Sequence, residues 1–193
     1  MLSEKAQELI KKSRIVSFQS WNQQYSADLV AIFQQADDEG LYLSDQDIAK
    51  IKTIAPELAT PLEQAKLLRD NVTEIVDYAR AEVLQAFPQI TEPGGGLYPA
   101  PRAEACWRDF WHFLRCISYG IAAKSLEYTS QEGLGYMEQL YQELQVPLDA
   151  MILGLSKLKE RSLTKFCLTK DGQCSVYFDH LIGELEKFAS QPV

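Results

Sequence analysis

Apolar side chains recur at steps of three and four residues along most of the chain, the spacing typical of amphipathic helices. Alternation of apolar and polar residues with a period of two never lasts beyond four residues. The pattern predicts one helix over residues 3–21 and a second from about Ser26 to segment 37–40, where Gly40 suits a left-handed helix end. We therefore predict an all-α fold with about eight helices.

Capping residues indicate where several further helices begin. Ser44, with Asp47 three residues later, predicts a helix start, and Pro56 limits that helix to about ten residues. Segment 60–63 (Thr-Pro-Leu-Glu) predicts the start of a longer helix, because it combines an N-cap threonine, a first-turn proline and a glutamate. The apolar face of this helix continues for more than six turns, until the Phe-Pro pair at 87–88.

A loop-rich segment separates this helix from the next. Residues 88–101 contain three consecutive glycines flanked by prolines, which excludes a helix there. A phosphate loop is also excluded, because no Gly-Lys-Ser/Thr follows the glycines and no strand precedes them. The following helices are predicted over residues 104–119, from segment 129–132 to about Leu144, from Pro147, and from Asp171 or Ser175.

Composition and charge bound what the chain can be. Its 193 residues, 46% of them hydrophobic, suit one domain over residues 1–193. The 27 acidic and 19 basic residues give a formal charge of −8, which repels nucleic acid and anionic lipid and makes neither an expected partner. No apolar run approaches the ~20 residues of a transmembrane helix, and the polar N-terminus does not resemble an export signal. We expect a cytoplasmic protein.

Four cysteines, at positions 106, 116, 167 and 174, allow either two disulfides or free thiols. We interpret them as free thiols in a reducing compartment, because the chain is long enough to form a core and shows no export signal. Their spacing contains no paired Cys-x-x-Cys steps, so a zinc site is not predicted.

The predicted helix over residues 104–119 combines aromatic, charged and thiol side chains. One stripe is built for burial and contains Trp107, Phe110, Trp111, Leu114, Ser118 and Ile121. Cys106, Asp109 and Phe113 share a neighbouring stripe, which places a thiol beside a carboxylate. Arg102 and Arg108 flank this thiol, and nearby guanidinium groups are expected to favour the thiolate. On spacing alone, a buried and inert thiol is the commoner role for Cys106.

The segment Cys106-Trp-Arg-Asp109, followed by Leu114-Arg115 and Tyr119, resembles the pattern Cys-x-Arg-Asp…Leu-Arg…Tyr of the phycobiliproteins, which are bilin-carrying light-harvesting subunits of phycobilisomes. Residues 31–44, 87–88 and 136–161 resemble, in the same order, segments of α-type phycocyanin and allophycocyanin subunits. The resemblance covers roughly residues 25–190. It implies a globin-like body over residues 41–193, preceded by an N-terminal helical pair over residues 1–40.

The resemblance also implies a site and a cofactor. Cys106 is expected to form a thioether with phycocyanobilin or a related linear tetrapyrrole. Asp109 is expected to accept hydrogen bonds from the central ring nitrogens, and Arg108 to hold a propionate. The other candidate binding residues are Arg102, Trp107, Tyr119 and Tyr98, of which Tyr119 and Tyr98 have ordinary packing roles as alternatives.

Two features depart from the family pattern, and three other residues leave alternatives open. Ala105 stands where the family often has a lysine, and residues 149–151 lack its usual tryptophan or tyrosine. Cys174 loosely resembles the second attachment site of β-type subunits, with an inert thiol as the alternative. His112 and His180 allow a haem ligand in a globin-like fold, although most single helical histidines have no such role.

The function implied by the resemblance is light harvesting and excitation energy transfer, not enzymatic turnover. No catalytic triad, metal cluster or paired carboxylates have a recognisable spacing. The expected partners are the bilin, a bilin lyase that assists attachment, and a like or different phycobiliprotein-like chain at the cytoplasmic face of the thylakoid. Phe18, Trp21 and Phe33 are expected to lie exposed and to pair with that chain. The alternative is a stand-alone bilin carrier, chaperone or sensor outside the phycobilisome.

Overall fold

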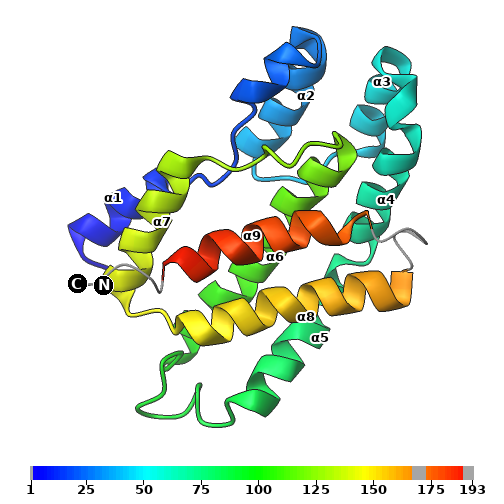
Figure 1. Cartoon of the computed structure of the whole chain (residues 1–193). Coiled ribbons are helices and arrows are strands. Elements are labelled where there is room, and N and C mark those ends of the chain that lie inside the picture. The colour runs from blue at the N-terminus through cyan, green and yellow to red at the C-terminus, as the bar shows by residue number, and fades with distance from the viewer. Residues whose placement is uncertain (1, 167–172, 189–193) are drawn as a thin grey trace.

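The computed structural model describes residues 2–166 and 173–188. Within these ranges the chain forms nine α-helices and two short 3-10 helices, and the only strand-like pairing is one antiparallel bridge between Val16 and Thr129 (Figure 1). The all-α prediction is therefore confirmed. The helices are α1 (Glu4–Lys12), η1 (Gln19–Gln23), α2 (Ala27–Asp38), α3 (Asp45–Ile54), η2 (Pro56–Leu58), α4 (Ala59–Asp70), α5 (Val72–Ala86), α6 (Ala100–Ala122), α7 (Gln131–Leu144), α8 (Leu148–Phe166) and α9 (Ser175–Lys187).

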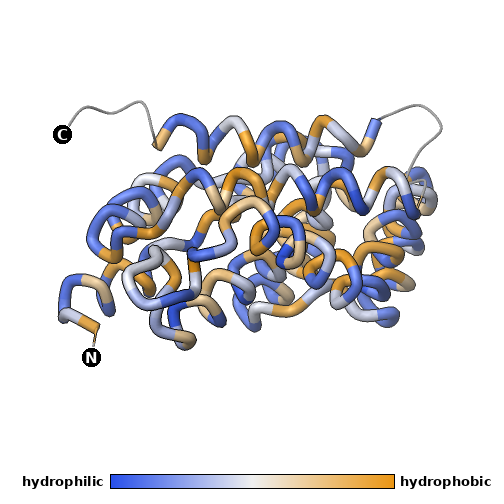
Figure 2. The backbone as a smooth tube through the Cα atoms, turned by 90° about the horizontal axis from the view of Figure 1, so that it is seen from below, coloured by the Kyte–Doolittle hydropathy of each residue, from blue (hydrophilic) through white to orange (hydrophobic). Residues whose placement is uncertain are grey.

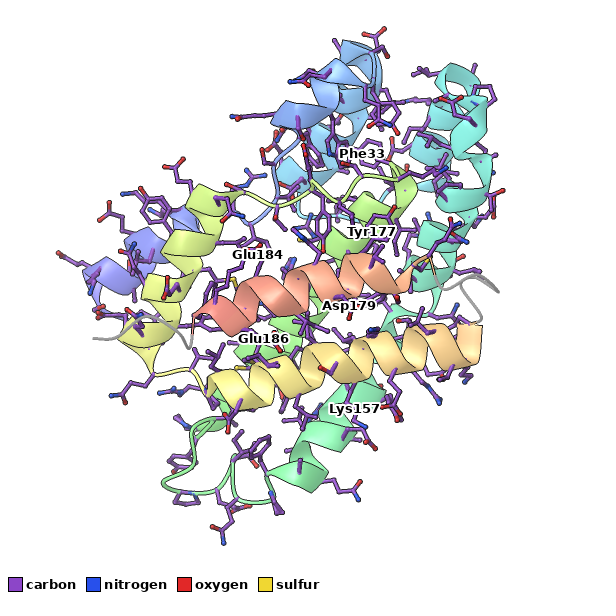
Figure 3. All side chains as sticks on the ribbon, in the orientation of Figure 1. Phe33, Lys157, Tyr177, Asp179, Glu184 and Glu186 are labelled. Carbon is purple, nitrogen blue, oxygen red and sulfur yellow. The ribbon has the colours of Figure 1, made fainter. Side chains whose placement is uncertain are left out.

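Helix α6 is the central element of the fold. It packs against α4, α5, α8 and α9, while α1 lies along α7, and α2 and α3 form the top end in Figure 1. Hydrophobic and hydrophilic segments alternate along most of the helices, which is why each helix buries one face (Figure 2). An ion pair between Lys159 and Asp179 joins α8 to α9, and Figure 3 shows Asp179 on α9.

Several predicted helix boundaries are confirmed by hydrogen bonds at the caps. Ser44 and Asp47 form a reciprocal capping box at the start of α3. Gly40 has a φ of +69°, the left-handed conformation expected at the end of α2. Helix α5 ends at Phe87, as predicted. The start of α9 at Ser175 is one of the two alternatives, and Asp171 lies outside the described residues.

Other predicted boundaries are wrong. The helix predicted over residues 3–21 ends at Lys12, because the following backbone leaves the helix to pair with the connection between α6 and α7. The long helix predicted from segment 60–63 is divided at Asn71, whose side-chain amide donates to the Leu67 carbonyl. Thr60 is not the N-cap that was predicted, because α4 already begins at Ala59, after a 3-10 turn.

Helix α7 also begins differently from the prediction. Its N-cap is Ser130, whose hydroxyl accepts from the Gly133 N–H at 3.0 Å. Thr129, the predicted cap, instead shares a hydrogen bond of 2.8 Å with Nε2 of His180.

The prediction that Phe18, Trp21 and Phe33 are exposed for pairing is wrong. All three side chains are buried inside the chain. The rings of Trp21 and Phe33 meet edge to face, with centroids 5.0 Å apart. The segment that follows α1 folds back onto α2 and α6, so these apolar residues find their partners within the same chain.

Candidate functional site

Helix α6 positions the candidate residues because its opposite faces meet different neighbours. Phe110 is fully buried toward α8, where Gly154 permits close packing. A Cβ atom on Gly154 would lie 2.0 Å from the Phe110 ring, so the two helices cross at a distance that only glycine allows. This contact fixes the rotation of α6 and turns Cys106 toward α7.

Cys106 lies in a buried environment beside Asp109, with only 5% of its surface exposed. Burial raises the pKa of its thiol to about 12; the Asp109 carboxylate adds to this effect and Arg102 opposes it. Arg102 thus favours the thiolate, as expected, but the cost of desolvating the charge is larger, so the thiol stays protonated. The guanidinium of Arg102 is also engaged elsewhere, donating to the carbonyls of Leu144 at 2.6 Å and Gln145 at 3.1 Å.

Asp109 is the second residue that faces α7. Burial raises the pKa of its carboxyl to about 6, against the opposing effects of Arg108 and of the facing Tyr141 hydroxyl. The group therefore changes charge close to neutral pH. Cys106 and Asp109 were correctly placed together by their three-residue spacing.

Tyr141 on α7 completes this group and was missed by the sequence analysis as a site residue. Only 6% of its surface is exposed, and its pKa is raised well above the usual range by burial and then by Asp109 and Cys106. Its hydroxyl faces the Asp109 carboxyl closely enough to affect that group's pKa, although it does not meet strict hydrogen-bond geometry. Within the described part of the chain, the buried Oε1 of Glu138, one turn earlier, has no hydrogen-bond partner. Buried polar atoms usually have partners, so both atoms are candidates to bind polar groups of a ligand.

Arg108 and Trp107 face away from Cys106. Two residues along a helix correspond to a rotation of about 200°, so Arg108 lies on the opposite side from the thiol. A groove of about 390 Å³ runs there between α5 and α6 and is lined by Thr73, Val76, Asp77, Glu104, Trp107, Arg108 and Trp111. The guanidinium of Arg80 lies over the Trp107 ring, 5.5 Å from its centroid. Arg108, the candidate cation for a propionate, therefore lies at the α5–α6 groove, on the other side of α6 from the Cys106 thiol.

Tyr98 and Tyr119 are both separate from the thiol site. Tyr98 is 47% exposed in the connection before α6, where its backbone N–H donates to Gly95. Tyr119 is fully buried thirteen residues after Cys106, about 20 Å along the helix axis. Its hydroxyl accepts from Arg115 at 2.8 Å and donates to the Leu41 carbonyl. Tyr119 therefore belongs to a structural network.

The remaining cysteines lie apart from this group. Cys116 is a free thiol in the core, and burial raises its pKa to about 12. The buried Cys174 thiol precedes α9 and donates to Oε1 of Gln64 at 3.4 Å, and burial raises its pKa to about 11. Cys167 lies outside the described residues. A second attachment site at Cys174 stays a prediction.

The two histidines make ordinary side-chain contacts. Nδ1 of His112 accepts from Nε of Arg115 at 3.4 Å, and burial with the nearby arginines lowers its pKa to about 4. His180 is held by Thr129. Over residues 2–166 and 173–188, no three His, Cys, Asp or Glu side chains gather in an arrangement that suits a metal ion.

None of the described helices combines the length and the apolar content needed to cross a membrane.

Comparison with known proteins identifies a family. A family model described as "Phycobilisome protein" matches residues 31–185. The allophycocyanin alpha chain of Mastigocladus laminosus is 31% identical over 150 residues, which are 78% of this chain and 94% of the relative. The allophycocyanin alpha chain of Galdieria sulphuraria is 29% identical over 151 residues, with the same coverage.

A solved structure supports the fold. It is a far-red fluorescent biliprotein derived from an allophycocyanin F subunit of Chroococcidiopsis thermalis. It matches with a TM-score of 0.60 and 24% identity, covering 66% of this chain and 96% of that one. The predicted globin-like packing of the phycobiliproteins is thereby confirmed.

Proposed function

Because the chain belongs to the phycobilisome protein family, whose members are light-harvesting pigment proteins and not enzymes, we propose that Cys106 carries a linear tetrapyrrole of the phycocyanobilin type through a thioether. The observation that carries this proposal is the convergence of the Cys106 thiol, the Asp109 carboxyl and the facing Tyr141 hydroxyl between α6 and α7. Together they supply an attachment atom, an acceptor for pyrrole N–H groups and a phenolic donor.

The bound tetrapyrrole supplies the absorption of light, and the chain holds it in place. Asp109 has its proton below about pH 6 and is an anion above it. As an anion it accepts hydrogen bonds from ring nitrogens and pairs with a positive charge on the pigment. The Tyr141 hydroxyl faces Asp109 and is placed to donate to that carboxylate or to the pigment. Arg108 and the tryptophans of the α5–α6 groove offer a cation and apolar walls on the side of α6 that faces away from the thiol.

The thiol itself needs assistance at the attachment step. With a pKa of about 12 it is almost entirely protonated at neutral pH, and the thiolate is the reactive form. An outside base or an opening of the α6–α7 contact must therefore precede attachment. This requirement agrees with assistance by a separate bilin lyase, and we include such a lyase among the partners.

The test is production of the chain together with phycocyanobilin and a lyase, followed by a denaturing gel read by zinc-enhanced fluorescence. Wild type and the control Cys116→Ala are expected to give fluorescent bands, because Cys116 lies in the core away from the site. Cys106→Ala is expected to give a dark band. A dark wild-type band, or a bright Cys106→Ala band, would contradict the proposed attachment.

The cellular role has two candidates. Within a phycobilisome, at the cytoplasmic face of the thylakoid, the chain would pair with another phycobiliprotein-like chain and pass excitation to its pigment. The alternative is a stand-alone bilin carrier or sensor, which the burial of Phe18 and Trp21 within this chain favours. Purification from a phycobilisome preparation distinguishes them, because only an antenna subunit is expected to remain with the assembled particle.

A further inference from the structure

The N-terminal segment of this chain lies outside the region shared with the family. The family model begins at residue 31. The match to the Mastigocladus laminosus relative covers 94% of that protein but only 78% of this chain, so this chain has residues without a counterpart there. We name residues 13–25, which follow α1 and contain η1, the cap segment.

The cap segment contributes large side chains to the core. Phe18 and Trp21 are buried, and their ring centroids lie 5.9 Å and 5.0 Å from that of Phe33 on α2. Phe18 also meets Tyr119 of α6 edge to face, at 5.9 Å. Figure 3 places Phe33 on the part of α2 that borders the end of α6. Without the cap segment, the faces of Phe33 and Tyr119 would be open to solvent.

Hydrogen bonds hold the cap segment along the connection between α6 and α7. The Ser17 N–H donates to the Tyr128 carbonyl at 3.1 Å, and the Ser130 N–H donates to the Ile15 carbonyl at 2.7 Å. Nε1 of Trp21 donates to the Glu127 carbonyl at 2.8 Å. These bonds give the cap segment one defined position, in addition to its apolar contacts.

Charge and backbone shape also match between the cap segment and the body. Arg14 pairs with Asp37 at 2.7 Å and with Asp38 at 2.8 Å, and Asp37 pairs in turn with Arg115. Gly133 on α7 permits the close approach, because a Cβ atom there would lie 1.8 Å from the Arg14 carbonyl oxygen. Even alanine at position 133 therefore conflicts with the observed position of the cap segment.

We propose that the cap segment covers an interaction face of this chain, made by Phe33, Asp37, Asp38, Arg115 and Tyr119, and thereby keeps two copies of the chain from pairing through it. The face combines apolar rings with both signs of charge, which a symmetric pair of identical faces requires for self-complementarity. Release of Arg14 leaves Asp38 without that cation and Asp37 with Arg115 alone. A second copy that brings its own Arg115 toward these carboxylates supplies a cation near Asp38 in place of Arg14, and its apolar side chains cover the rings.

The variant Gly133→Ala tests the proposal, with Gly135→Ala on the same helix as its matched control. Nothing lies within 4 Å of a Cβ atom on Gly135, so the control adds the same methyl group without displacing the cap segment. Sedimentation velocity over a range of concentrations reports association, and limited trypsin cleavage after Lys12 and Arg14 reports release. Gly133→Ala is expected to be cleaved faster and to dimerise about tenfold more tightly, or more, than wild type and control.

Two results would overturn the proposal. One is a cap segment that is cleaved rapidly in Gly133→Ala while the chain associates no more than wild type. The other is a wild-type chain that already dimerises as tightly as the variant. If Gly133→Ala leaves the cap segment protected, the double variant Phe18→Ser and Trp21→Ser releases it without changing the face, and the same two readings then apply.

Discussion

Burial raises the pKa of the Cys106 thiol and the charge of Arg102 lowers it, and burial has the larger effect. The thiol has a pKa of about 12, so we predict that iodoacetamide at pH 8 modifies Cys106 in the folded, pigment-free chain at least about 100-fold more slowly than in urea. Mass spectrometry of the peptide that contains Cys106 measures both rates. Cys174, with a pKa of about 11, is a reference within the same sample. Equal rates in the folded and unfolded chain would mean that the thiol is open to solvent.

Asp109 predicts a dependence of stability on pH. The folded chain raises the pKa of this carboxyl from 3.8 to about 6, so it binds the proton more tightly than the unfolded chain does. The resulting stabilisation is fully present below pH 3.8 and is lost as the pH rises through about 6. Asp109→Asn, which does not titrate, is expected to become more stable than wild type at pH 8 by on the order of 1–2 kcal/mol, allowing for partial exposure.

Urea unfolding of the pigment-free proteins between pH 4 and pH 8 measures this difference. The other titrating groups are common to both proteins, so they cancel when the two profiles are subtracted. If the free energies of unfolding of wild type and Asp109→Asn run parallel against pH, Asp109 is not buried against α7 in solution.

Residue spacing predicted part of the site and failed where contacts depend on a second helix. Cys106 and Asp109 are three residues apart on one helix, so their proximity follows from helical geometry alone. Arg108 is nearer to Cys106 in sequence but faces the α5–α6 groove. Tyr141 reaches the site from α7, and in the sequence it is indistinguishable from the other apolar positions of that helix.

At the scale of elements, a buried ion pair joins α2 to α6. Oδ1 of Asp37 lies 2.7 Å from Nη1 of Arg115, and 7% of the Asp37 side chain and 9% of the Arg115 side chain are exposed. Asp37→Asn leaves the Arg115 charge buried without this partner, so we predict a loss of about 3–5 kcal/mol in the free energy of unfolding. Asp38→Asn is the matched control: its carboxylate also binds Arg14 but is 52% exposed, and a change within about 0.5 kcal/mol is expected. Urea unfolding of both variants and of wild type measures these two changes in the free energy of unfolding.

Helix packing predicts a second pair of variants. A Cβ atom on Gly154 would meet the Phe110 ring at 2.0 Å, so Gly154→Ala forces α8 away from α6 and is expected to cost about 1–3 kcal/mol. Gly183→Ala in α9 meets nothing within 4 Å and is expected to be neutral or to stabilise by up to about 1 kcal/mol. Thermal unfolding of the two variants checks the contrast. Equal losses would show that α6 and α8 do not cross as closely as described.

Helix starts were easier to predict than helix breaks. Ser44 with Asp47 satisfies backbone groups locally, so the sequence around the cap contains the whole signal. The break at Asn71 and the early end of α1 depend on competing hydrogen bonds and on the pairing of Val16 with Thr129, more than a hundred residues away. A similar distance helps to explain why Trp21 was expected on the surface: its indole N–H donates to the Glu127 carbonyl, 106 residues away in the connection between α6 and α7.

At the scale of the whole molecule, the site lies where side chains of the central helix meet α7, and α7 also packs against α1 and the cap segment. The fold therefore places the proposed pigment between α6, which packs against α4, α5, α8 and α9, and α7, which packs against α1. A ligand bound only by the folded state adds its binding free energy to stability, and a covalent one cannot dissociate when the concentration falls. Attachment at Cys106 is thus expected to stabilise the entire chain and not only its immediate surroundings.

We predict that the pigment-loaded chain melts at least about 2–4 °C above the pigment-free chain, the shift that corresponds to ~1 kcal/mol in a protein of this size. The physical source is a hydrogen-bond partner for Oε1 of Glu138 and a further one for the Tyr141 hydroxyl, together with new apolar contacts around α6. Differential scanning calorimetry of wild type and of Cys106→Ala, each produced with and without the pigment, separates attachment from expression effects. A gain that persists in Cys106→Ala would indicate non-covalent binding, whereas no gain in wild type would place the pigment on the surface, outside the contact between α6 and α7.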